Sequence, residues 1–144
     1  MDDESPRLVL VVEDELQDVE RVEQVLKEYG VTIQVLARAF EANAYLRREH
    51  GFANAVRPSL VLLDWKLAGG GESVLRTIRE TDALRETPVV VLSRSGADLD
   101  VRAAYAGHAN AFVVKPADID SYRGRLTSIC DFFLRVSELP TPVD

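Results

Sequence analysis

Polar residues that could bind a metal ion or a phosphate group follow four short apolar runs of the sequence. The first of these runs ends at Glu13-Asp14, and the later ones end at Asp64, Ser93 and Lys115. In an open parallel sheet, ligands bind at the carboxyl ends of the strands. If the four runs are neighbouring strands, we therefore expect these side chains to meet in one crevice.

The acidic residues of this set require a positive partner. Two carboxylates about 5 Å apart repel each other by roughly 3 kcal/mol at an effective dielectric constant near 20. Such a cluster raises its pKa values or binds a cation, and ligands that are all oxygen favour a hard cation such as Mg²⁺. Lys115 then supplies a second positive charge for a phosphoryl group, and Ser93 supplies a hydroxyl donor. Asp64 is left as a nucleophile that forms an aspartyl phosphate.

The elements that position these residues alternate regularly between strand and helix. Unbroken apolar runs, typical of buried parallel strands, lie at 8–12, 60–63, 88–92 and 111–114, and residues 31–35 alternate as one more strand. Amphipathic stretches at 15–29, 40–49, 72–81, 98–106 and 118–136 predict helices, the first with Leu16, Val19, Val22, Leu26 and Tyr29 on its apolar face. Five strand-then-helix units predict a doubly wound parallel α/β sheet with helices on both faces.

The overall composition fits one acidic globular domain. The chain has 144 residues and a formal net charge of −7, and we expect a domain at 7–137 between tails at 1–6 and 138–144. The negative charge argues against nucleic-acid binding. The absence of a long apolar run argues against a membrane span, and the acidic N-terminus argues against a secretory signal, so we expect a cytoplasmic protein. The single cysteine, Cys130, excludes an internal disulfide.

At these residues the chain resembles the receiver domain of two-component response regulators (the CheY-like, flavodoxin-like fold). The resemblance rests on four segments, each at the end of a predicted strand: Val11-Val12-Glu13-Asp14, Leu62-Leu63-Asp64, Val91-Leu92-Ser93 and Val114-Lys115-Pro116. It covers nearly the whole chain, from Leu8 to about Val136, and it implies a strand order of 2-1-3-4-5.

The resemblance also implies a role for each site residue. Asp14 and Asp64 would ligate Mg²⁺ directly, Glu13 would act through water, and the backbone carbonyl of Lys66 would complete the protein ligands. Lys115 would contact the phosphate, with a cis bond to Pro116. Ser93 and Phe112 would form the switch pair, a hydroxyl residue and an aromatic that move together on phosphorylation.

Three further segments resemble single-domain response regulators that are paired with phytochrome histidine kinases: 45–49, 82–92 and 132–140. This resemblance implies a light-responsive sensor kinase as the phosphoryl donor. It also favours a homodimer through the last helix, where Phe132-Phe133-Leu134 and Val136 are apolar around more than one face. The chain departs from the family at Ala39-Phe40, at His108 where glycine is usual, and at Lys66, which lies within reach of attacking water.

The resulting hypothesis is a phospho-accepting response regulator that signals by protein–protein contact and is not an enzyme beyond its own phosphotransfer and dephosphorylation. A pseudo-receiver scaffold that is never phosphorylated remains an alternative. An aspartyl phosphatase is disfavoured because Lys66 stands where an acid/base aspartate is needed. A flavin carrier is disfavoured because Glu13-Asp14 would repel the cofactor's phosphate in the absence of a metal.

Overall fold

The computed structural model describes residues 7–144, and the predicted tail at 1–6 lies outside the described residues. The strands are β1 (Leu8–Val12), β2 (Thr32–Leu36), β3 (Leu60–Asp64), β4 (Val89–Ser93) and β5 (Ala111–Val114). The α-helices are α1 (Leu16–Leu26), α2 (Ala39–Arg47), α3 (Gly71–Glu80), α4 (Asp98–Ala106) and α5 (Ile119–Asp131). Short 3-10 helices, η1 (Lys27–Tyr29) and η2 (Asp82–Leu84), follow α1 and α3, and a π-helical segment, η3 (Phe132–Val136), continues α5.

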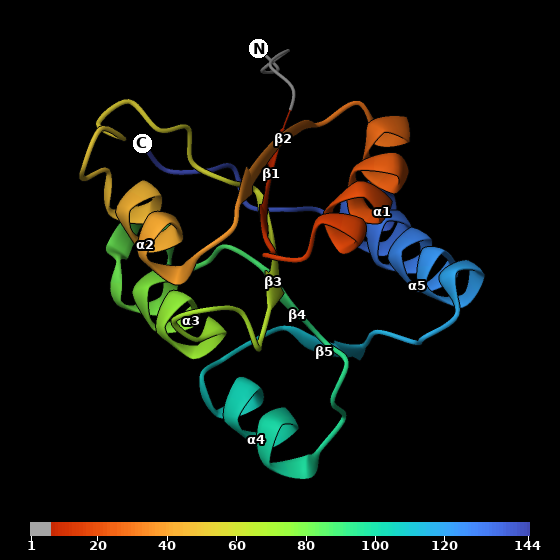
Figure 1. Ribbon diagram of the computed structural model, residues 1–144. Helices are drawn as coiled ribbons and strands as arrows, with labels where there is room; N and C mark the ends of the chain where they lie inside the picture. The colour runs from red at the N-terminus through yellow and green to blue at the C-terminus, as the bar shows by residue number, and fades with distance from the viewer. Residues whose placement is uncertain (1–6) are drawn as a thin grey trace.

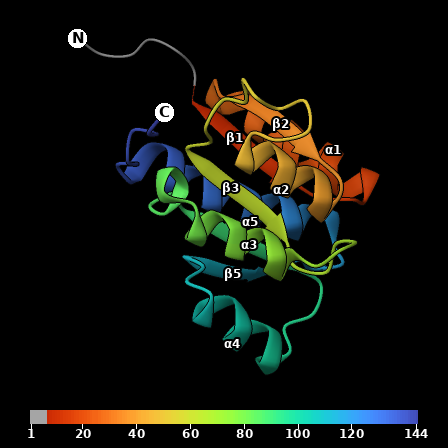
Figure 2. The same cartoon turned by 90° about the vertical axis from the view of Figure 1, so that its left-hand side faces the viewer.

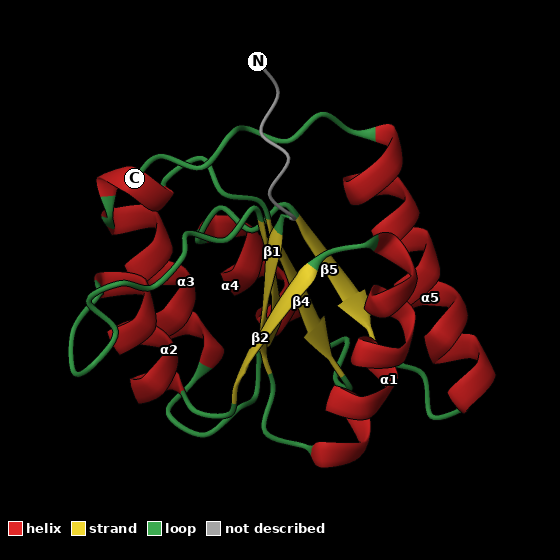
Figure 3. Cartoon of the chain, turned by 90° about the horizontal axis from the view of Figure 1, so that it is seen from above, coloured by secondary structure: helices red, strands yellow, loops and turns green. Residues whose placement is uncertain are grey.

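The five strands form one parallel sheet in the order β2-β1-β3-β4-β5. Helices α1 and α5 cover one face of the sheet, and α2, α3 and α4 lie on the other, as Figure 1 shows from the side and Figure 3 from above. Figure 2 looks onto the second face, where α2 and α3 lie in front of β3. The doubly wound fold that the sequence predicts is confirmed.

The apolar core consists of two layers, one on each face of the sheet. Leu10 and Val12 contribute to the layer under α2 and α3, whereas Val9 and Val11 contribute to the layer under α1 and α5. Successive strand side chains point to opposite faces, so a strand that is covered on both sides must be apolar throughout. Each of these side chains stabilises the fold by roughly 1.5–3 kcal/mol relative to its exposed state.

The strand order creates a crevice at the carboxyl ends of β1 and β3. From β1 the chain moves outward to β2, but from β3 onward it moves the other way through β4 to β5. The helices that follow β1 and β3 consequently leave toward opposite faces of the sheet. The gap between them is the topological switch point at which α/β proteins bind ligands.

The first helix is rotated relative to the sequence prediction. Val22 and Leu26 are buried as expected, but Leu16, also expected on the apolar face, is 70% exposed, and Asp18 and Val25 are buried in addition. The predicted end of this segment is correct, because Gly30 has a left-handed conformation (φ 65°) directly after η1. The error therefore concerns the face of the helix and not its position in the chain.

The end of α4 explains why the chain can have His108 where glycine is usual in the family. His108, and not the preceding glycine, adopts the left-handed conformation (φ 69°), and its carbonyl accepts two hydrogen bonds from Arg79 (2.8 and 3.0 Å). At Gly107 a Cβ atom would lie 2.8 Å from Leu75 Cδ2, so a larger residue there would displace that side chain. The two residues thus divide roles that a single glycine could perform.

Candidate phosphotransfer site

Three carboxylates meet at the switch point. Val12 of β1 pairs with Leu63 of β3, so the next residues along the two strands, Glu13 and Asp64, lie side by side. Asp14 joins them from the exposed rim, and one oxygen from each of the three residues lies within 4.8 Å of the others. Glu13 and Asp64 are buried, at 3% and 7% exposure. The carboxylates expected from the sequence to meet at one edge of the sheet do meet.

Lys115 directly follows the edge strand β5, and its long side chain brings a positive charge to the same point. Its Nζ atom lies 2.5 Å from Glu13 Oε1, 3.0 Å from Asp18 Oδ2 and 3.5 Å from Asp64 Oδ1. The side chain is only 2% exposed. The backbone N–H of Lys115 donates to the carbonyl of Ser93 (2.8 Å), which extends the β4–β5 pairing up to the site.

Burial and charge act on the ionisable groups in opposite directions. Burial raises the pKa of Glu13 to about 7, although Lys115 counteracts this rise. Burial by itself lowers the pKa of Lys115, but the contacts with Glu13, Asp64 and Asp18 outweigh it and raise the pKa above its ordinary value. Lys115 is therefore a charged ammonium at neutral pH, as stabilisation of a phosphoryl group requires.

The donor set fits a hard divalent cation such as Mg²⁺. The buried residues Glu13, Asp18 and Asp64 share one ammonium, and Asp14 adds a fourth carboxylate at the rim. Arg94 also pairs with Asp18, but the three carboxylates of the cluster carry more negative charge than the one ammonium of Lys115, and all the side-chain ligands are oxygens. Glu13, Asp14 and Asp64 are the residues that would hold the ion.

The predicted switch residues lie on one face of the sheet beside the site. Ser93 is fully buried at the end of β4, and its Oγ accepts a hydrogen bond from the backbone N–H of Ser95 (3.2 Å). Phe112 pairs with Val91 in the sheet register, and it packs partly buried on the face under α2, α3 and α4. Val91 and Ser93 are two residues apart, so Ser93 points to the same face as Phe112.

The Lys115–Pro116 bond differs from what the sequence suggested, whereas the role of the Lys66 backbone carbonyl as a metal ligand stays a prediction. The Lys66 side chain is not directed at the site but pairs with Asp100 of α4 (3.0 Å), while its backbone N–H donates to Asp64 Oδ1 (3.4 Å). The described residues contain no cis peptide bond, so the predicted cis bond to Pro116 is wrong. The trans form is the lower in energy, and with it Lys115 still reaches Glu13.

Two functional candidates were missed by the sequence reasoning, namely Asp18 and Arg94. The Asp18 side chain is 3% exposed and contacts Lys115 as well as Arg94, whose Nη2 donates to both carboxylate oxygens (3.0 and 3.2 Å). The signal available in the sequence was the position of Asp18, four residues before Val22 on the same helical stripe. A carboxylate on a stripe that packs against the sheet requires a buried partner.

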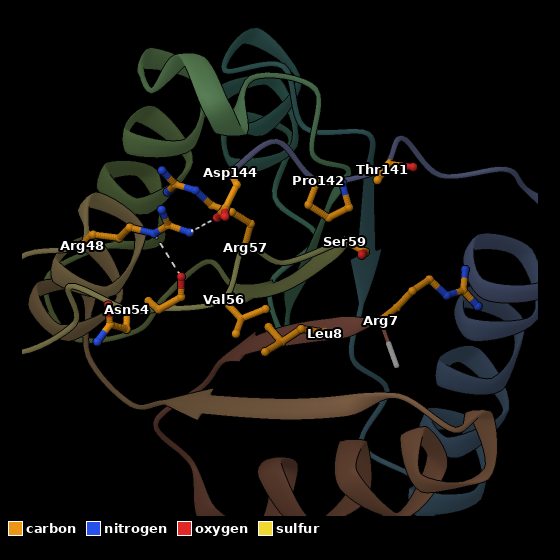
Figure 4. Close-up of a pocket in the computed structure, with 11 residues that line it drawn as sticks. Arg7, Leu8, Arg48, Asn54, Val56, Arg57, Ser59, Thr141, Pro142 and Asp144 are labelled. Atoms are coloured by element: carbon orange, nitrogen blue, oxygen red, sulfur yellow. Dashed lines mark hydrogen bonds and ion pairs between the residues drawn. The ribbon is translucent and has the colours of Figure 1, made fainter. Parts of the chain in front are cut away.

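A separate pocket lies at the opposite edge of the sheet. It has a volume of about 480 Å³ and is lined by residues at the amino ends of β1 and β3, including Leu8 and Ser59 (Figure 4). Arg48 pairs there with Asp144 (2.7 Å) and donates to the carbonyl of Ala55 (3.0 Å). Because the acid cluster follows the carboxyl ends of the same strands, this pocket is not part of the site.

Fold and site together define the class to which the protein belongs. The family model of the response regulator receiver domain matches residues 9–127, and the chain belongs to this family. The fold and the family expected from the four strand-end segments are thus confirmed. Among the described residues, no helix is both long and apolar enough to cross a membrane.

Two response regulators are similar to this chain over nearly its full length. The response regulator Rcp1 of Synechocystis sp. is 34% identical, and the match covers 97% of this chain and 99% of Rcp1. Among solved structures, the phosphorylated cyanobacterial phytochrome response regulator RcpA has a TM-score of 0.91 at 32% identity, with 95% of this chain and 100% of RcpA covered. The Mn²⁺-bound form of Rcp1 has a TM-score of 0.90, also at 32% identity, with 94% and 100% covered.

Proposed function

We propose that Asp64 accepts a phosphoryl group from the phosphohistidine of a sensor kinase and that the phosphorylated domain signals by contact with a partner protein. The observation that carries this proposal is the convergence of Glu13, Asp14, Asp64 and Lys115 on one point at the switch point of the sheet. A nucleophile, a set of cation ligands and a fixed ammonium together provide what phosphoryl transfer needs.

In the proposed reaction an Asp64 oxygen attacks the phosphorus atom. The bond from oxygen to phosphorus forms while the bond from phosphorus to the histidine nitrogen breaks, and the electron pair of that bond stays on the imidazole. A bound Mg²⁺ offsets the charge on the phosphoryl oxygens. Lys115 donates to one of these oxygens from its buried position, and Glu13 and Asp14 would hold the cation together with Asp64. Each residue is already placed within the site before the phosphoryl group arrives.

Ser93 and Phe112 connect this chemistry to the surface. The fully buried Ser93 hydroxyl lies at the end of the strand next to β3, on the face where Phe112 packs. The Ser93 hydroxyl, which accepts from the Ser95 N–H, would donate its own hydrogen to the new phosphoryl group, and its movement would give Phe112 room to reorient. This change would shift the balance between two conformations of α4 and β5.

The phosphoryl donor is a phytochrome-type histidine kinase in this proposal. Its support is the similarity to Rcp1 and RcpA over nearly the full length of both chains, together with the description of RcpA as a phytochrome response regulator. Assay of the purified protein against a panel of sensor kinases, each with its own labelled phosphohistidine, tests this pairing. Faster transfer from kinases of another class would contradict it. The reaction takes place in the cytoplasm, according to the same proposal.

The assignment of Asp64 is tested with acetyl phosphate and Mg²⁺. We expect the wild type to gain the mass of one phosphoryl group, and we expect no gain in Asp64→Asn or in the presence of a chelator. The exposed Asp120 of α5 provides a matched control, since Asp120→Asn removes the same charge away from the site. An equal gain in wild type and Asp64→Asn would defeat the assignment, and no gain in the wild type would favour the pseudo-receiver alternative.

The second part of the proposal is a homodimer through the last helix and the C-terminal region. Phe132 and Val136 are 53% and 73% exposed on η3, whereas Leu134 between them is buried. Leu139 packs against the core layer under α1 and α5, so the segment after η3 lies along the same side. Exposed apolar side chains on a helix that is already covered on its inner face suit contact with a second copy.

A further inference from the structure

Lys115 is held by three carboxylates, and they are not equivalent. The ammonium donates hydrogen bonds to Glu13 and Asp18, whereas Asp64 lies 3.5 Å away as an ion pair. Glu13 and Asp64 also belong to the cluster that would hold the cation, and Asp64 is the proposed phosphoryl acceptor. Both residues must therefore change partners during the reaction.

Asp18 is the carboxylate that can keep its hydrogen bond with Lys115 during the reaction. It lies in the first turn of α1, its oxygens are not part of the acid cluster, and its side chain is 3% exposed. Asp18 accepts a hydrogen bond from Lys115 Nζ at 3.0 Å, and nothing in the proposed reaction requires this bond to break when Glu13 and Asp64 turn to the cation and the phosphoryl group. It can thus hold the ammonium beside the phosphoryl group while its other two partners are occupied.

A second contact fixes the orientation of Asp18. Arg94 Nη2 donates to both of its oxygens, and Arg21 lies 3.9 Å from Oδ1. Such contacts balance the charge of the buried carboxylate without removing its bond to Lys115. Arg94 directly follows Ser93, so these contacts also join α1 to the loop that follows β4.

We propose that Asp18 is a positioning residue for phosphotransfer: it holds the Lys115 ammonium in place, and Arg94 orients it. This inference rests on the proposed function of Asp64. The plainer explanation is that Asp18 only stabilises the amino terminus of α1, as acidic residues in a first turn commonly do. That explanation requires neither Lys115 nor burial of the side chain, and an experiment can separate the two.

The experiment is a double-mutant cycle between Asp18 and Lys115. We expect Asp18→Asn to slow labelling by acetyl phosphate by roughly tenfold, the loss of one charge-assisted hydrogen bond. In a Lys115→Met background the same substitution should change the rate by less than about twofold, because the residue through which Asp18 acts is gone. Asp18→Glu should restore part of the rate. If helix stabilisation were the only role, the slowing would be equal in both backgrounds.

Glu15 provides the matched control. It pairs with the same Arg94 (3.1 Å), but its side chain is 50% exposed and does not contact Lys115. Glu15→Gln makes the same change of charge as Asp18→Asn, and we expect it to alter the labelling rate by less than about twofold. Equal slowing by both substitutions would overturn the proposal, since it would attribute the effect to Arg94 or to net charge.

A second measurement does not depend on turnover. Trp65, the single tryptophan, adjoins Asp64, so its fluorescence can report binding of Mg²⁺ and of beryllofluoride, a phosphoryl analogue. We expect Asp18→Asn to weaken beryllofluoride binding when Lys115 is present but not in the Lys115→Met variant. The affinity for Mg²⁺ should be unchanged in both proteins. If the wild type is labelled at Asp64 and Asp18→Asn is labelled equally fast, this inference fails alone. If the wild type is not labelled, the proposed function itself fails.

Discussion

At the scale of single residues, the site collects buried charges that a stable core would avoid. Glu13, Asp18, Asp64 and Lys115 are all less than a tenth exposed. Removing two such ions from water costs more than their attraction returns unless their hydrogen bonds are complete, so buried ion pairs are weak contributors to stability. Their concentration at the switch point is therefore explained by function and not by the stability of the fold.

The acid cluster makes a prediction about Mg²⁺ and stability. At a tenfold excess over its dissociation constant, a cation that binds only the folded state adds about 1.4 kcal/mol, which corresponds to ~3–6 °C in the thermal midpoint of a domain of this size. We expect the wild type to show this increment in thermal unfolding. We expect Asp14→Asn to lose most of it with little effect on the metal-free protein, because Asp14 is exposed.

The control for this measurement is again Asp120→Asn, which should keep the full increment. If Asp14→Asn kept it as well, the cation would be bound elsewhere. Chelation should reverse the increment in the wild type.

At the scale of elements, the loop from β3 to α3 is the part most constrained by the site. Gly71 begins α3 directly over the end of β3, and a Cβ atom there would lie 2.6 Å from the Asp64 carbonyl oxygen and 2.9 Å from Trp65 Cα. Its own N–H donates to the Trp65 carbonyl (3.0 Å). The glycine therefore lets the helix begin in contact with the segment that carries the proposed nucleophile.

Two glycine substitutions should have opposite effects on stability. Gly71→Ala places a methyl group against backbone atoms that cannot easily move, and we expect it to destabilise the fold by about 1–3 kcal/mol. Gly124 lies in the interior of α5 with nothing within 4 Å of a Cβ position, so Gly124→Ala should stabilise by about 0.5–1 kcal/mol. Urea denaturation measures both changes. A neutral Gly71→Ala would show that the loop can move away from Asp64.

At the scale of the whole molecule, the two faces of the sheet carry different groups of residues. The face with α1 and α5 carries Asp18 and the exposed apolar residues of η3, whereas the opposite face carries Phe112. The site lies at the carboxyl edge between the faces, and a change there can reach either of them. Dimer contact and output can therefore occupy separate surfaces.

The proposed dimer predicts a mass of twice the 16.0 kDa chain in light scattering at micromolar concentration. We expect Phe132→Ser to shift the protein toward the mass of one chain, because it removes a half-exposed ring from the proposed interface. Tyr105 of α4 is similarly exposed, at 50%, and Tyr105→Ser should leave the mass unchanged. A wild type that is monomeric under these conditions would rule the dimer out.

The sequence by itself determined the strands, their parallel arrangement and the residues at their carboxyl ends. A strand that is covered on both faces must be apolar throughout, so the residue that ends the run is visible without coordinates. Asp64, Glu13-Asp14, Ser93 and Lys115 were predicted in this way. Their roles still follow from the family resemblance and stay predictions.

Only the tertiary structure decided which face of α1 is buried and what lies beneath it. At roughly 100° per residue, Leu16 and Asp18 point about 160° apart, toward opposite edges of the buried stripe, and the rotation of the helix in the structure buries the edge with Asp18. The contacts that set this rotation join α1 to Lys115 and Arg94, residues far away in the chain. The trans Lys115–Pro116 bond is likewise seen only in the structure, because the resemblance implied cis. Contacts between distant residues leave no periodic trace in a sequence.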